Sequence, residues 1–90
     1  MRTIHKFTSE VEEAIAFNVP AGAKFLHVDR DTRNPDELAF WFEVETSRMD
    51  EEKVEFVVVG TGKPLPFHAM RHVGSVLMGP YIWHVYAERC

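Results

Sequence analysis

The chain lacks the features that mark secreted and membrane proteins. It has one cysteine, the last residue Cys90, so no internal disulfide can form, whereas secreted domains of this size usually carry several. The first residues, Met1 to Lys6, are not followed by the apolar stretch of a signal peptide. The longest apolar runs, such as residues 56–59, are far too short to span a bilayer. We therefore expect a cytoplasmic protein with no membrane partner.

Clusters of positive charge are also absent. Ten Lys and Arg are scattered among fourteen Asp and Glu, and the net charge is −4 with His neutral. Nucleic-acid binding needs clustered basic residues to neutralise phosphates, so we expect no nucleic-acid partner. Motifs for nucleophilic catalysis are equally scarce, because Ser75 lacks a nucleophile elbow and Cys90 stands at a terminus. No catalytic residue is assigned from the sequence.

Two short motifs match known phosphate and zinc sites only in part. Gly60-Thr61-Gly62-Lys63 lacks the spacing of a Walker loop, and Pro64 follows where a helix should begin. His68 and His72 have a helical zinc spacing, but on a strand they would lie about 13 Å apart. We expect no metal and no cofactor. The glycine loop stays a candidate for contacting an anion through Lys63 and backbone N–H groups.

What the chain does have is a series of short apolar segments between turn signals at nearly regular spacing. The expected strands cover residues 2–8, 10–19, 23–30, 37–46, 53–60, 70–78 and 81–88. This pattern is typical of an all-β fold, a single small antiparallel β-sandwich or barrel of about six to seven strands spanning residues 1–90. Strands 37–46 and 53–60 are expected to form a hairpin, and Gly74 to mark a bulge.

One segment is ambiguous. In residues 10–19 the alternation of Val11, Ile15, Phe17 and Val19 predicts a strand, whereas capping-box spacing favours a short helix near residues 10–18.

Polar groups near the glycine loop are the ligand-binding candidates, and exposed aromatic residues are the interface candidates. The ligand-binding candidates are Gly60, Thr61, Gly62, Lys63, His68, Arg71, His72 and His84. The interface candidates are Trp41, Tyr81, Trp83 and Tyr86. Trp41 shares its strand face with Glu43 and Glu45, so either a neighbouring loop covers it or it contacts a partner.

Several motifs occur in a familiar order along the whole chain. They are His5-Lys6-Phe7, Pro20-Ala21-Gly22-Ala23-Lys24-Phe25, Phe40-Trp41-Phe42, Gly60-Thr61-Gly62-Lys63-Pro64, Arg71-His72-Val73-Gly74 and Trp83-His84-Val85. Together they resemble a family of small uncharacterised bacteriophage proteins. The resemblance implies an all-β domain in the cytoplasm of an infected bacterial host, and it brings no known activity or catalytic residue.

The preferred hypothesis is a non-enzymatic phage accessory protein that acts by binding. It would form a homo-oligomer through strand edges or an apolar sheet face, since a small β domain has exposed edges to cover. Its partner would be a host protein, such as a defence factor, or a small anionic ligand such as a nucleotide signal. The alternatives are a structural or assembly protein of the virion, and a small hydrolase with His72 or His84 as general base.

Overall fold

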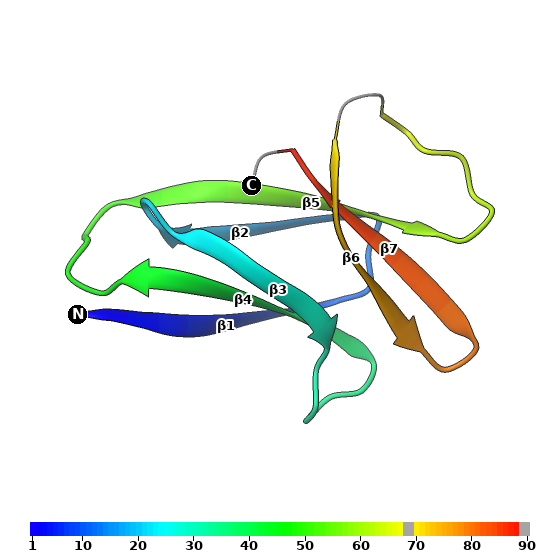
Figure 1. Cartoon of the computed structure of the whole chain (residues 1–90), viewed down its shortest axis with the longest axis horizontal. Helices are drawn as coiled ribbons and strands as arrows, with labels where there is room; N and C mark the ends of the chain where they lie inside the picture. The colour runs from blue at the N-terminus through cyan, green and yellow to red at the C-terminus, as the bar shows by residue number, and fades with distance from the viewer. Residues whose placement is uncertain (68–69, 89–90) are drawn as a thin grey trace.

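Every regular element in the described part of the chain is a β-strand. The structure, a computed structural model, describes residues 1–67 and 70–88 (Figure 1). The strands are β1 (Arg2–Glu10), β2 (Ala14–Pro20), β3 (Lys24–Arg30), β4 (Glu37–Glu45), β5 (Glu51–Gly60), β6 (Arg71–Met78) and β7 (Tyr81–Ala87). All pairings between them are antiparallel. The predicted all-β fold of about six to seven antiparallel strands is confirmed, and of the two predicted forms, sandwich or barrel, the structure is a sandwich with strand ends shifted by a few residues.

The strands form two sheets. Sheet A has the order β1-β4-β3, and sheet B has the order β2-β5-β7-β6. The predicted hairpin of β4 and β5 is wrong, because residues 46–50 carry the chain from sheet A to sheet B. Both strands have an apolar face, and these faces meet across the core instead of lying edge to edge.

The core between the sheets combines aliphatic side chains with a cluster of phenylalanine rings. Phe40 of β4 and Phe56 of β5 lie with ring centroids 4.6 Å apart, and Phe17 of β2 is 5.1 Å from Phe40. Phe7 of β1 meets Phe42 edge-on at 5.5 Å. Such pairs add about 0.5–1.5 kcal/mol each beyond the apolar area that they bury. The aromatic residues of the sequence therefore make a substantial part of the contact between the two sheets.

The ambiguous segment forms part of a strand. Ile15 and Val19 of β2 are buried, whereas the alternating residues Ala14, Ala16 and Asn18 are exposed. This period of two is the strand pattern, and no helix forms in residues 10–18. Pairing with β5 decides the outcome, since an isolated capping box is worth too little to compete with burial of a whole face.

The sheets approach each other most closely where β3 meets β6, at the lower right of Figure 1. Gly74 of β6 makes this possible, because a Cβ at this position would lie 2.6 Å from Cγ1 of Val28. The predicted bulge is confirmed, with the register of β6 on β7 shifting between His72 and Gly74. A second bulge lies in β3, between Phe25 and His27.

One carboxylate is buried within the described part of the chain. Asp31, 2% exposed, follows β3 and accepts hydrogen bonds from Lys6 Nζ at 2.8 Å and from the Asn34 backbone at 3.2 Å. The hydrogen bond from Lys6 is the main cause that holds the pKa of Asp31 below its ordinary value. Asp31 thereby fixes the turn that joins β3 to β4.

Candidate functional site

The ligand-binding candidates fall into two groups on either side of the loop that follows β5. Gly60 and Lys63 line a pocket, whereas Thr61 joins His84 and His72 on the outer face of sheet B. Gly62 takes a φ of 87° in the turn between these groups. Arg71 is exposed and belongs to neither group, and His68 lies outside the described residues.

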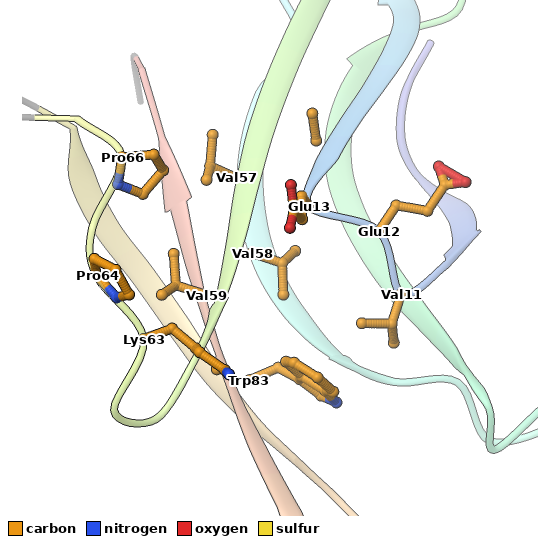
Figure 2. Close-up of a pocket in the computed structure, with 12 residues that line it drawn as sticks. Val11, Glu12, Glu13, Val57, Val58, Val59, Lys63, Pro64, Pro66 and Trp83 are labelled. Carbon is orange, nitrogen blue, oxygen red and sulfur yellow. The ribbon is translucent and has the colours of Figure 1, made fainter.

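The pocket, here called the loop pocket, has a volume of about 660 Å³ (Figure 2). Residues 11–14 form one side and residues 57–60 of β5 form the floor. Lys63, Pro64 and Pro66 form the other side, and Trp83 of β7 closes one end. The volume lies in the range of ordinary small-molecule sites, and the walls are mainly valine, proline and tryptophan.

Gly60 explains how the tryptophan reaches the loop pocket. Gly60 pairs with Trp83 across the β5–β7 ladder, and a Cβ on Gly60 would lie 3.2 Å from Cζ3 of the indole. The bare glycine therefore lets the ring lie close to the end of β5. Tyr81 of the same strand stacks with the indole at a centroid distance of 5.7 Å, which helps to fix the plane of the ring.

The charged groups of the loop pocket stand on opposite sides. In Figure 2 the Lys63 side chain runs toward β7, the strand that carries Trp83. Glu12 and Glu13 come from the side of β2. The arrangement suits a ligand with a flat apolar body, one anionic group for Lys63 and hydrogen-bond donors for the carboxylates.

The second group forms a hydrogen-bonded row, here called the histidine–serine chain. Thr61 Oγ1 lies 2.8 Å from His84 Nε2, and His84 Nδ1 lies 2.9 Å from Ser75 Oγ. Ser75 Oγ in turn lies 3.0 Å from His72 Nε2. The β6–β7 ladder places Ser75 directly opposite His84, and the bulge brings His72 to the other side of the hydroxyl.

One direction of proton donation satisfies the whole histidine–serine chain. The Thr61 hydroxyl donates to the carbonyl of Ile82 at 3.5 Å and accepts from His84 Nε2–H. His84 Nδ1 then accepts from the Ser75 hydroxyl, which accepts from His72 Nε2–H. In this arrangement of protons Ser75 donates to an imidazole, as a nucleophile does to its base. None of these four residues lines the loop pocket.

The interface candidates occupy three different places. Trp41 is half-buried on the outer face of sheet A, where the ring of His27 covers it at 5.7 Å. Trp83 lines the loop pocket with Tyr81 exposed beside it. Tyr86 lies on the outer face of sheet B, 5.3 Å from the His72 ring. A side chain on the adjacent strand therefore covers part of Trp41.

Sequence reasoning set Ser75 aside, although a signal for it exists. The two-residue turn Gly79-Pro80 fixes the register of β6 on β7. Counting outward from that turn puts Ser75 opposite His84. Glu12 and Glu13 were missed for a different reason, because nothing local shows that residues 11–14 face the loop after β5.

Comparison with known proteins identifies a family and nothing finer. Residues 1–67 and 70–88 contain no helix long and apolar enough to cross a membrane, and no cluster of three metal-ligating side chains. No curated protein and no solved structure matches the chain significantly. The family model described as "Domain of unknown function (DUF7352)" matches residues 1–90, and the chain therefore belongs to that family.

Proposed function

We propose that the protein is a non-enzymatic binding protein that works as a homo-oligomer and takes a small anionic ligand of the nucleotide class in the loop pocket. The observation that carries the proposal is that one cation, Lys63, and one indole, Trp83, line the same mainly apolar pocket.

A nucleotide supplies a partner for each kind of group in the loop pocket. Its base stacks on the flat face of an indole, and such contacts are worth about 1–3 kcal/mol per base. Its phosphate pairs with Lys63. Glu12 and Glu13 accept hydrogen bonds from ribose hydroxyl or base amino groups, as acidic residues do in dinucleotide sites. Two carboxylates against one ammonium favour a ligand with few phosphates.

The proposed setting is that of a bacteriophage accessory protein inside an infected host. Its support is the resemblance of the motif order to small phage proteins. In that setting, binding of a nucleotide signal or of a host defence protein would interfere with host responses without any chemistry by the protein itself.

Calorimetry against a panel of mononucleotides and cyclic nucleotides tests the ligand. We expect binding by at least one member, and we expect Lys63→Ala to weaken it at least tenfold because the phosphate loses its cation. Lys53→Ala removes the same charge from β5 outside the loop pocket and should leave affinity within twofold. Absence of heat with every nucleotide would remove the proposal.

A second candidate function rests on the histidine–serine chain. Ser75 Oγ lies 2.9 Å from His84 Nδ1, which is the distance of a serine nucleophile from its general base. An esterase function predicts turnover of small activated esters by the wild type and loss of at least a hundredfold in Ser75→Ala. Equal rates in both proteins would exclude Ser75 as nucleophile.

A further inference from the structure

The sandwich has four edge strands, β1 and β3 in sheet A and β2 and β6 in sheet B. An edge strand offers unpaired backbone N–H and C=O groups to any other strand. Soluble proteins protect such edges with charged side chains, prolines or bulges. The four edges differ in how far they are protected.

Three edges carry recognisable protection. The β3 and β6 edges each have a bulge, between Phe25 and His27 and between His72 and Gly74. Bulges twist an edge and break the regular spacing that a pairing strand needs. The β1 edge is regular but charged, and its Arg2 and Lys6 form ion pairs with Glu43 and Asp31.

The β2 edge has almost none of this protection. Its exposed residues are Ala14, Ala16 and Asn18, and the strand contains no charged side chain. Its register on β5 is continuous from Ala14 to Pro20, so no bulge interrupts it. Pro20 blocks only the last position. On the inner face Phe17 stays half-buried, which leaves part of its ring to be covered.

We propose that two copies of the chain pair through antiparallel β2 edges, centred on Phe17, so that two four-stranded sheets become one of eight strands. This inference rests on the self-association in the proposed function and names the surface. It places Ala16 opposite Asn18 of the partner subunit, and Ile15 opposite Val19 of the partner subunit. The pairing is isologous, as closed dimers require.

Side-chain chemistry favours this edge over its rivals. No charges oppose each other, and the small outward residues let the two backbones approach. The same symmetric pairing of β3 about His27 would set Lys24 opposite Arg30 of the partner subunit, and like charges directly opposite destabilise a ladder. The half-buried Phe17 rings would lie beside each other at the centre of the new interface.

A charge-swap experiment tests the edge and the register together. In Ala16→Lys/Asn18→Lys, each lysine faces a lysine of the other copy, and in Ala16→Glu/Asn18→Glu each glutamate faces a glutamate. Light scattering should show a dimer for the wild type and at least a tenfold weaker association for each variant alone. An equimolar mixture of the two variants should recover the dimer. Circular dichroism checks that each variant is folded.

Leu77→Lys is the matched control, because it puts the same charge on an exposed apolar residue of another edge, β6. It should keep the wild-type dimer. Hydrogen exchange on the wild type gives a second readout if a variant unfolds. The β2 amides that point away from β5 should exchange slowly, and faster on dilution.

The outcomes separate this proposal from the broader one. A wild type that stays monomeric at high concentration overturns both the edge and the self-association. A wild-type dimer that survives both charge variants, or that breaks with Leu77→Lys, overturns the edge alone. Nucleotide binding is measured separately by calorimetry. The test of the loop pocket is therefore independent of the test of the β2 edge.

Discussion

The outer faces of the two sheets differ in the groups that they carry. On sheet A, Arg2 pairs with Glu43 across the β1–β4 ladder, and Lys6 reaches Asp31. On sheet B the outer face carries the histidine–serine chain and the exposed pair Leu77 and Ile82, together with the ion pair of Lys53 and Glu55 on β5. Side chains whose charges are already paired are stable when exposed to water. Exposed apolar side chains, in contrast, are stabilised when a partner covers them.

This difference assigns different tasks to the sheets. The loop pocket, the histidine–serine chain and the unprotected β2 edge all belong to sheet B or its loops. Sheet A contributes one wall of the core and a solvated face. In the proposed binding function, sheet A therefore serves as support and sheet B carries the candidate contacts.

The largest expected effect on stability comes from a substitution at Gly74, where the two sheets approach each other. Gly74→Ala puts a methyl group into contact with Val28 and should lower the free energy of unfolding by about 1–3 kcal/mol, the usual cost of overpacking. Combining it with Val28→Ala should cost less than the sum, because the shortened side chain makes room. Urea unfolding of the four proteins measures this coupling. Additive losses would contradict the close approach of β3 and β6.

The sequence predicted strands well and their partners less well. Alternation in β4, with Leu38, Phe40 and Phe42 on one side, is a local property and is visible in the chain. The pairing of β4 depends on residues distant in the sequence and is not visible in the chain. Any strand with one apolar face is compatible with a hairpin as well as with a sandwich. The loop pocket escaped prediction for the same reason, because it joins residues 11–14 to Lys63 through the pairing of β2 with β5.

The second-largest expected effect is a pH-dependent loss of stability on the charged side of sheet A. The folded-state pKa of Asp31 is lowered, chiefly by the hydrogen bond from Lys6, so its contribution to stability is present above the ordinary value of 3.8. That contribution is lost as the pH falls through the folded-state pKa. Asp31→Asn should therefore be less stable than wild type at pH 7, and the difference should shrink below about pH 4. Urea midpoints from pH 7 to pH 2 measure it.

Asp50→Asn is the control for this titration. Asp50 pairs with Arg48 at 3.0 Å, and this contact lowers its pKa in the same direction, but the pair is exposed. Water and salt weaken exposed pairs, so this variant should change the midpoint less than Asp31→Asn at every pH. Equal losses of stability in the two variants would mean that Asp31 contributes no more than an ordinary exposed ion pair.

A smaller effect is expected on the outer face of sheet B. Ser75→Ala removes the hydroxyl that links His72 to His84 and should lower the free energy of unfolding by about 0.5–1.5 kcal/mol. Nitrogen NMR of the imidazoles gives the specific readout, because His84 Nδ1 loses its donor. Thr8→Val removes an exposed hydroxyl from β1 and should leave these signals unchanged. Unaltered imidazole signals in Ser75→Ala would contradict the histidine–serine chain.

The smallest effect belongs to Leu77, which is 64% exposed on β6 and faces Ile82 across the β6–β7 ladder. Leu77→Lys gives up little buried area, so the free energy of unfolding should change by no more than about 0.5 kcal/mol. Binding of a hydrophobic dye should fall, because the exposed pair is broken. A stability loss several times larger would mean that Leu77 is covered in solution. In that event the hairpin end of sheet B, and not the β2 edge, would be where two copies meet.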